Sequence, residues 1–230
     1  MHRKHGKTAL RRTPGRAKTA DLSAAFLDLR GRKALVVGGG NVAARKVTAL
    51  GGTGARICVV APEVSPSLAR AAAKDGVIIE KREYRRSDLR GAWLVVAATD
   101  SREVNRAVAR DAREARVFCN VVDSPALCSF QVPSVVKRGL LQVAVSTGGA
   151  SPALARDLRV QLERQFGSQY ARLLEAALEL RRHVQQKYPG DAARRRRLME
   201  KFVSSRAATL LLAGRQMKAF RRELEQWKSL

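Results

Sequence analysis

The chain reads Val36-Val37-Gly38-Gly39-Gly40-Asn41-Val42-Ala43 where an apolar, strand-like run passes into a helix-like one. Gly38 permits a tight turn, Gly40 lets the backbone approach a ligand closely, and Ala43 keeps the following helix close to the sheet. The N-terminus of that helix offers unpaired N–H groups and a partial positive charge to an anion. The segment therefore predicts a strand–turn–helix unit that holds the pyrophosphate of a dinucleotide.

Short apolar runs alternate with longer helical runs on both sides of this turn. Apolar strands that alternate with helices are typical of a parallel sheet covered on both faces. With right-handed crossovers, the pattern predicts an α/β fold with a doubly wound parallel sheet of the NAD-binding Rossmann type. The expected strands are Ala34–Val37, Arg56–Ala61, Val77–Glu80, Trp93–Ala98 and Val117–Val122, and the expected helices lie near 42–51, 64–75 and 102–113.

The pattern changes after Pro125, where a second and smaller element is expected. Ser129–Val132 and Leu141–Ser146 have the composition of two short strands. Ser151 is a good N-cap residue and Pro152 suits the first helical position, so a helix is expected to begin there. The segment after Pro125 is therefore expected to form a small separate α+β element.

The rest of the chain is almost entirely helical in period. Tyr188-Pro189-Gly190 interrupts it and separates a helix near 168–187 from one that begins near Asp191. The solvated face of these helices is expected to hold His183, and the run Arg194–Arg197 is expected to be solvated or to face the substrate. The expected divisions are a basic disordered tail (1–20), a Rossmann domain (21–125), the small α+β element (126–166) and a helical C-terminal domain (167–230).

The net charge of +25 predicts attraction to polyanions. The first 20 residues hold seven Lys or Arg residues and no acidic residue, but most of the excess charge lies in the rest of the chain. Nucleic acid and a substrate with many carboxylates are both polyanions that this positive charge would attract. Aromatic residues make up only 5% of the chain and no basic run is interleaved with them, so no specific nucleic-acid partner is expected.

The number and spacing of cysteines and histidines indicate whether disulfides or a metal site are expected. Cys58, Cys119 and Cys128 are odd in number and far apart, which favours free thiols in a reducing cytosol over disulfides. The chain has three histidines and no CxxC motif, so no metal site is expected. No apolar run is long enough to span a membrane, and no membrane partner is expected.

Three expected strand ends carry candidate functional residues. Glu63 follows the second strand and suits the adenosine ribose hydroxyl, although it could instead be a first-turn helix acid. No arginine stands at this strand end, so NAD is favoured over NADP. Thr99 can contact the cofactor from the fourth strand, whereas Asp100 and Glu103 resemble a capping box, which is the favoured interpretation of Asp100.

Asp123 follows the fifth strand, at the edge of the sheet where substrate would meet cofactor. Its position before Ser-Pro is also typical of a residue that stabilises a turn, and composition alone leaves the two interpretations level. Thr147-Gly148-Gly149 precedes the capped helix at Ser151. This loop is either a second anion cradle or a plain entry to the helix.

Together these residues resemble the precorrin-2 dehydrogenase/sirohydrochlorin ferrochelatase family, the N-terminal module of siroheme synthase. The resemblance implies an NAD-dependent oxidation of precorrin-2 to sirohydrochlorin and an optional second step that inserts Fe²⁺. The carboxylate-rich tetrapyrrole suits the arginine-rich chain. The matching segments, in family order, are Leu35–Lys46, Val60–Glu63, Ala97–Asp100 with Val104-Asn105, Asn120–Pro125 and Val145–Arg156.

The resemblance also implies roles for single residues. Asp123 matches the aspartate implicated in both steps. The residues expected to line the NAD site are Gly38, Gly40, Asn41, Val42, Pro62, Glu63 and Thr99. Those expected to border the tetrapyrrole pocket are Ser146, Thr147, Gly148, Gly149 and Ser151.

Family members are homodimers, and the resemblance implies that the small α+β element of residues 126–166 is the dimerisation element. No methyltransferase module is expected because the chain ends at Leu230. The alternative to an enzyme is a dinucleotide-sensing regulatory domain that uses the glycine turn without chemistry. A sensor needs neither Asp123 nor the loop at 147–151, so these two features favour the enzyme.

Overall fold

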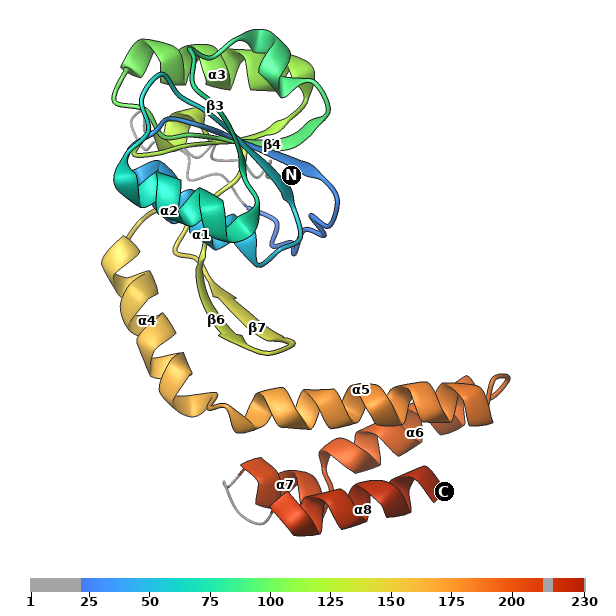
Figure 1. Cartoon of the computed structure of the whole chain (residues 1–230). Coiled ribbons are helices and arrows are strands. Elements are labelled where there is room, and N and C mark those ends of the chain that lie inside the picture. Colours follow the sequence, from blue (N-terminus) through green and yellow to red (C-terminus); the bar gives the residue numbers. More distant parts are fainter. Residues whose placement is uncertain (1–21, 213–216, 230) are drawn as a thin grey trace, which may run out of the picture.

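The computed structural model describes residues 22–212 and 217–229. The basic tail expected over 1–20 lies outside the described residues. Along the chain, an α/β domain is followed by a hairpin with a long helix and then by a group of packed helices (Figure 1). This order agrees with the fold class expected from the sequence.

Five parallel strands form the sheet of the α/β domain, in the order β3-β2-β1-β4-β5. Each strand agrees with its predicted range to within one residue at either end. Because the strands are parallel, their carboxyl ends lie at one edge of the sheet, and those of β1, β4 and β5 are neighbours there. The strands are β1 (Lys33–Val37), β2 (Arg56–Val60), β3 (Ile78–Glu80), β4 (Ala92–Ala97) and β5 (Phe118–Val121).

Helices cover both faces of this sheet, as a doubly wound fold requires. α1 (Asn41–Gly51) and α2 (Pro66–Asp75) lie on one face, and α3 (Arg102–Ala115) lies on the other (Figure 1). Alternate residues of β1 enter the two cores: Val36 packs with α1 and α2, whereas Leu35 packs with α3. Two short 3₁₀ helices, η1 (Arg86–Leu89) and η2 (Pro125–Leu127), follow β3 and β5.

A buried carboxylate holds η1 in place. Asp88 is 8% exposed and accepts hydrogen bonds from both terminal nitrogens of Arg82, at 2.9 and 2.7 Å, and from the amide of Arg85 at 2.8 Å. Burial alone would raise the pKa of Asp88, but these hydrogen bonds outweigh it and lower the pKa below its usual value. The pair is therefore a structural element of the α/β domain.

The small second element is an antiparallel hairpin of β6 (Ser134–Arg138) and β7 (Leu141–Val145). The strand predicted at Ser129–Val132 is wrong. These residues instead cover the free edge of β5, where the amides of Ser129 and Phe130 donate to the carbonyl of Cys119 at 2.8 and 3.4 Å. An edge strand leaves backbone groups unpaired, and this segment supplies their partners.

α4 (Pro152–Gln165) begins after the N-cap Ser151, as predicted. The Arg138 side chain donates to the carbonyls of Phe166 and Glu163, at 2.9 and 3.3 Å, and thereby ties β6 to the end of α4. Unpaired carbonyls at a helix end need such donors. The hairpin and α4 are therefore joined by specific hydrogen bonds.

The C-terminal helices share a third core around Leu180, Phe202 and Phe220. Two arginines of the predicted solvated patch hold the turn at 188–190: Arg194 stacks on the Tyr188 ring, and Arg195 donates to the Tyr188 and Pro189 carbonyls. These helices are α5 (Gln169–Lys187), α6 (Ala192–Val203), α7 (Arg206–Leu212) and α8 (Met217–Ser229).

His183 of α5 departs from the solvated position expected for it. Its side chain is half-buried, and its Nε2 atom is buried without a hydrogen-bond partner among the described residues. All three cysteines carry free thiols, as expected. In the described part of the chain, no helix is both long enough and apolar enough to cross a membrane.

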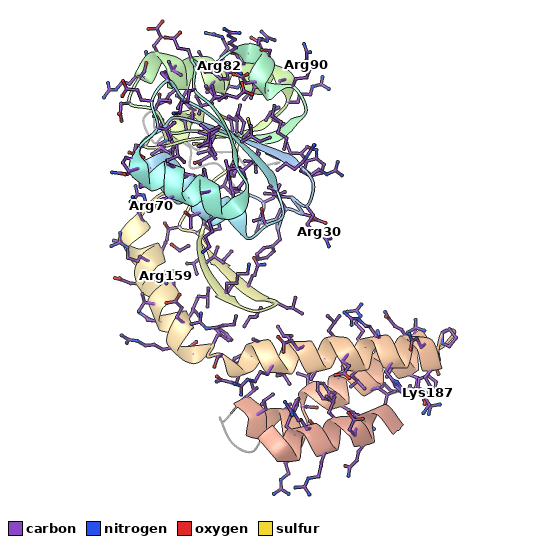
Figure 2. The ribbon with its side chains drawn as sticks, in the orientation of Figure 1. Arg30, Arg70, Arg82, Arg90, Arg159 and Lys187 are labelled. Carbon is purple, nitrogen blue, oxygen red and sulfur yellow. The ribbon has the colours of Figure 1, made fainter. Side chains whose placement is uncertain are left out.

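Basic side chains occur on every part of the molecule. Arg30 precedes β1, and Arg70, Arg159 and Lys187 lie on α2, α4 and α5 (Figure 2). The excess positive charge is therefore spread along the chain and is not confined to one helix.

Candidate functional site

The glycine turn connects β1 to α1 at the carboxyl edge of the sheet. Gly38 has a φ of 125°, and a Cβ atom there would lie 2.3 Å from the carbonyl oxygen of Ala98. A Cβ atom at Gly39 would lie 1.7 Å from the carbonyl oxygen of Glu63. Only glycine fits at either position. The sequence pattern identifies Gly38 but not Gly39, because Gly39 is constrained by a strand end that is distant in sequence.

Gly40 leaves open space beside the N-terminus of α1. No heavy atom lies within 4 Å of the position that its Cβ would take. Gly40 is the N-cap residue, and no side chain caps the first turn of the helix. The first N–H groups of α1 are therefore available to an anion. This cradle fits the pyrophosphate of a dinucleotide.

Asn41 and Val42 form the first turn of α1, where the cofactor is expected. Asn41 is exposed, and its Oδ1 atom accepts a hydrogen bond from the Ser67 hydroxyl of α2 at 2.5 Å. Val42 is half-buried. The structure therefore brings both residues to the cradle and links Asn41 to the start of α2.

Pro62 and Glu63 are both exposed in the segment that follows β2. The interpretation of Glu63 as a first-turn helix acid is wrong, because α2 begins at Pro66 with Ser65 as its N-cap. The amide of Ser65 donates to the carbonyl of Gly39 at 2.9 Å and ties this segment to the glycine turn. Glu63 thus lies beside the turn with its carboxylate exposed.

Thr99 is fixed at the end of β4. Its hydroxyl donates to the Asn105 side chain at 2.8 Å, and the Asn105 amide donates to the Thr99 carbonyl at 2.9 Å. The predicted capping by Asp100 is wrong: Ser101 is the N-cap of α3, and its hydroxyl accepts from the Val104 amide at 3.3 Å. Asp100 is exposed.

Asp123 lies at the same edge, directly after β5. Hydrogen bonds from Ala98 N to Val37 O, at 2.7 Å, and from Val122 N to Ala97 O, at 3.0 Å, extend the sheet to this point. The ends of β1, β4 and β5 are therefore adjacent, and they carry Gly38, Thr99 and Asp123, respectively.

The backbone of Asp123 is in an unusual conformation. Its φ is 56°, a value uncommon outside glycine, although aspartate tolerates it better than most residues. The side chain is exposed, and among the described residues its carboxylate has no hydrogen-bond or ion-pair partner. A backbone bond from Ser124 N to Val121 O, at 3.3 Å, closes the turn instead. The carboxylate is thus free to accept a proton, and the turn does not depend on it.

The loop before α4 is held by its own hydroxyl groups. Ser146 accepts from the Gly148 amide at 3.1 Å, Thr147 bonds both the amide and the carbonyl of Ser151 at 3.1 Å, and the Ser151 hydroxyl caps α4. Gly148 and Gly149 have positive φ values of 61° and 85°. What the loop offers to a ligand is therefore mainly backbone.

This loop lies beside the chain that leads away from Asp123. A Cβ atom on Gly149 would lie 3.7 Å from the side-chain nitrogen of Gln131. Residue 131 belongs to the segment that connects the end of β5 to the hairpin. The loop thus lies next to the segment that connects Asp123 to the hairpin.

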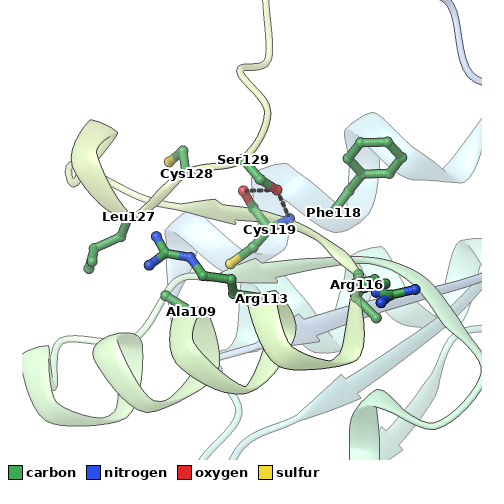
Figure 3. A pocket seen from close by; sticks show the side chains of 9 residues that line it. Ala109, Arg113, Arg116, Phe118, Cys119, Leu127, Cys128 and Ser129 are labelled. Atoms are coloured by element: carbon green, nitrogen blue, oxygen red, sulfur yellow. Dashed lines mark hydrogen bonds between the residues drawn. The ribbon is translucent and has the colours of Figure 1, made fainter. Parts of the chain in front are cut away.

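A cavity of about 260 Å³ lies on the outer side of β5, between α3 and residues 127–129 (Figure 3). No residue predicted for the cofactor or substrate site lines it. Cys119 contributes to its wall, and burial raises the pKa of this thiol to about 11. Within the described ranges, no cluster of three or more His, Cys, Asp or Glu side chains could hold a metal ion.

Three family models match consecutive parts of the chain. A model for NAD(P)-binding domains matches residues 25–134, one for the central part of sirohaem biosynthesis proteins matches 138–165, and one for the sirohaem synthase dimerisation region matches 169–226. The last description falls on the C-terminal helices, so the assignment of dimerisation to 126–166 stays a prediction, as do the other domain limits.

Similar proteins of known family agree with these matches. Siroheme synthase of Methylobacillus flagellatus is 46% identical over 74% of this chain and 36% of its own length. Siroheme synthase of Pseudomonas paraeruginosa is 42% identical over 85% of this chain and 42% of its own length. The chain thus spans roughly two fifths of the length of these curated relatives.

A solved structure is similar over almost its whole length. SirC, a precorrin-2 dehydrogenase, superposes with a TM-score of 0.72 and 26% sequence identity, over 90% of this chain and 99% of SirC. The family models, the curated relatives and this structure point the same way. The chain therefore belongs to the precorrin-2 dehydrogenase/sirohydrochlorin ferrochelatase family, the family of the N-terminal module of siroheme synthase.

Proposed function

We propose that the protein oxidises precorrin-2 to sirohydrochlorin with NAD⁺ as the acceptor. The reaction removes two electrons and two protons, so that precorrin-2 and NAD⁺ give sirohydrochlorin, NADH and H⁺. The observation that carries this proposal is the placement of the unpartnered Asp123 carboxylate at the sheet edge that also bears the glycine cradle. A dinucleotide sensor has no use for a free carboxylate at this position.

The residues at the carboxyl edge of the sheet have different roles in this reaction. The first-turn N–H groups of α1, after Gly40, hold the cofactor phosphates, and Asn41, Val42, Pro62 and Thr99 line its path. The nicotinamide, when bound, supplies the hydride acceptor. Asp123 accepts the proton that the substrate loses. The loop from Ser146 to Ser151 borders the tetrapyrrole through Thr147 and the Gly148 and Gly149 backbone.

The dependence of the reaction on cofactor tests this proposal. Precorrin-2 is incubated with the protein under anaerobic conditions, with and without NAD⁺, and its absorption spectrum is followed. The expected result is conversion to the sirohydrochlorin spectrum only when NAD⁺ is present. Equal conversion without NAD⁺, or none with it, would count against the proposal.

The preference for NAD over NADP is assigned to Glu63. Its exposed carboxylate lies beside the glycine turn, where it suits a ribose 2′-hydroxyl and repels a 2′-phosphate. We expect Glu63→Ser to reduce the ratio of kcat/KM for NAD⁺ to that for NADP⁺ by about tenfold, a change that corresponds to about 1.4 kcal/mol. An unchanged ratio in steady-state assays with both cofactors would show that Glu63 does not set this preference.

Insertion of Fe²⁺ into sirohydrochlorin is proposed as a second activity of the same site. The free Asp123 carboxylate can accept the pyrrole N–H protons that the metal replaces. The test supplies sirohydrochlorin and Fe²⁺ or Co²⁺ without NAD⁺. Faster metal insertion than in a protein-free control supports the proposed chelatase activity, and an equal rate in the two samples excludes it.

The protein is further proposed to form a homodimer. The C-terminal helices match a dimerisation region, and the hairpin and α4 expose Val135, Leu140 and Leu154. Exposed apolar side chains on adjacent elements are typical of an interaction surface. We expect sedimentation equilibrium to give twice the chain mass of 25.2 kDa, whereas the mass of a single chain would exclude the dimer at that concentration.

A further inference from the structure

Lys46 lies on α1 between residues that are buried against the sheet. Ala43 and Val47 belong to the core on this face, and Val122, the residue before Asp123, packs against the same core. The Lys46 side chain is half-buried. Helix side chains lean toward the helix N-terminus, and the N-terminus of α1 lies at the sheet edge that also carries Asp123. Lys46 thus lies on the part of α1 that packs on the same core as the residue before Asp123, and its charge is close enough to Asp123 and Cys128 to interact with both.

The Lys46 ammonium lacks a counter-ion at contact distance. Among the described residues it has no ion pair and no hydrogen bond. Burial lowers the pKa of Lys46 below its ordinary value, whereas the nearby Cys128 and Asp123 act in the opposite direction. A partly buried charge is unfavourable unless an anion meets it. A bound carboxylate would compensate this cost.

We propose, on the basis of the proposed function, that Lys46 binds a carboxylate side chain of the tetrapyrrole beside Asp123. Lys46 thereby sets which edge of the macrocycle meets the catalytic carboxylate. Arg45 is exposed on a different side of α1, in a groove with Asn41, Thr48 and Ser67, and does not share this position.

The cofactor phosphates are a less suitable partner for Lys46. They already meet the first-turn N–H groups near Val42 in the proposed site, and Lys46 begins four residues further along α1, about 6 Å down the helix axis. A tetrapyrrole bound at Asp123 carries carboxylates on its periphery. These carboxylates can reach the Lys46 ammonium, because the Lys46 charge lies near Asp123. The two possibilities predict different effects on the KM values of the two substrates.

The test compares Lys46→Met, Lys46→Gln and Lys46→Arg with the wild-type protein. Lys74→Met is the matched control, because Lys74 is exposed in the last turn of α2. KM and kcat are measured separately for precorrin-2 and NAD⁺, and thermal unfolding verifies that each variant folds. We expect both neutral variants to raise the KM for precorrin-2 by about tenfold or more, the size expected for a lost hydrogen bond between charged groups.

The KM for NAD⁺ is expected to change less than about twofold, Lys46→Arg to recover most of the affinity, and Lys74→Met to match the wild type. An unchanged KM for precorrin-2 in both folded neutral variants would overturn the proposal. A rise in the KM for NAD⁺ alone would also overturn it and would assign Lys46 to the cofactor.

Binding of a stable tetrapyrrole separates this proposal from the proposed function. Uroporphyrin III, which carries carboxylate side chains of the same kind, is titrated into each protein and followed by its fluorescence. If the wild type fails to oxidise precorrin-2 but binds uroporphyrin III more tightly than Lys46→Met by about tenfold, the oxidation proposal fails while the role of Lys46 stands. Equal binding by the wild type and both neutral variants counts against Lys46 itself.

Discussion

Asp123 combines a left-handed backbone conformation with a carboxylate that has no partner among the described residues. Such conformations are costly and are often found at functional sites. The conformation turns the chain at the end of β5 while the carboxylate stays exposed at the edge that bears the glycine cradle. The geometry gives Asp123 the position and the freedom that a general base needs.

We expect Asp123→Asn to reduce kcat for precorrin-2 oxidation by about 100-fold or more, the range for loss of a general base. The KM for NAD⁺ should stay unchanged, because the cradle is distinct from this residue. Asp100→Asn is the matched control, since Asp100 is an exposed acid at the neighbouring strand end, and its kcat should equal that of the wild type. A fully active Asp123→Asn protein would contradict the assignment.

At the scale of elements, the turn between β1 and α1 packs against two other strand ends. Gly38 touches the end of β4, and Gly39 touches the segment after β2. We expect Gly39→Ala to destabilise the domain by about 1–3 kcal/mol, because the new methyl group meets the Glu63 carbonyl. NAD⁺ affinity should fall as well, because the turn must move.

Gly52→Ala provides the comparison for this variant. Gly52 has a φ of −77° and open space where a Cβ atom would lie, so alanine should be tolerated. Chemical denaturation measures both changes in the free energy of unfolding. Equal stabilities of Gly39→Ala and the wild type would show that the turn has more room for a side chain at Gly39 than this structure indicates.

The sequence predicted the elements whose signals are local. The five sheet strands and the glycine turn follow from apolar runs and turn residues that lie next to each other in the chain. The prediction of a strand at Ser129–Val132 was wrong because the conformation of this segment depends on β5. Its amides bond to the free edge of that strand. Gly39 and Lys46 were missed for the same reason: their roles arise from Glu63 and from the turn at Asp123, which no local pattern connects to them.

The sequence also did not predict which hydrogen bonds form locally at the ends of the helices. Asp100 and Ser101 are both good N-cap residues, and the backbone at the end of β4 places Ser101 at the cap. The hydroxyls of Ser146, Thr147 and Ser151 were expected to border the substrate, but the structure shows that they bond within their own loop. That this loop borders the tetrapyrrole stays a prediction, and the groups that the loop leaves for a ligand are mainly backbone groups.

At the scale of the whole molecule, acid should destabilise the α/β domain through Asp88. Its pKa is lowered in the folded state, so the ionised form stabilises the protein above the ordinary value of 3.8. This contribution is lost as the pH falls through the lowered pKa. We expect the free energy of unfolding of the wild type to fall more steeply below pH 3.8 than that of Asp88→Asn. Parallel pH profiles in urea denaturation would show that Asp88 does not contribute.

The coupling of hydride transfer to tetrapyrrole oxidation tests the central claim most directly. Absorbance of NADH and of sirohydrochlorin is recorded in the same anaerobic reaction of wild-type protein, precorrin-2 and NAD⁺. We expect the two products to appear together in equal amounts and Asp123→Asn to slow both alike. Tight NAD⁺ binding without either product would instead identify a dinucleotide sensor and rule out the proposed dehydrogenase.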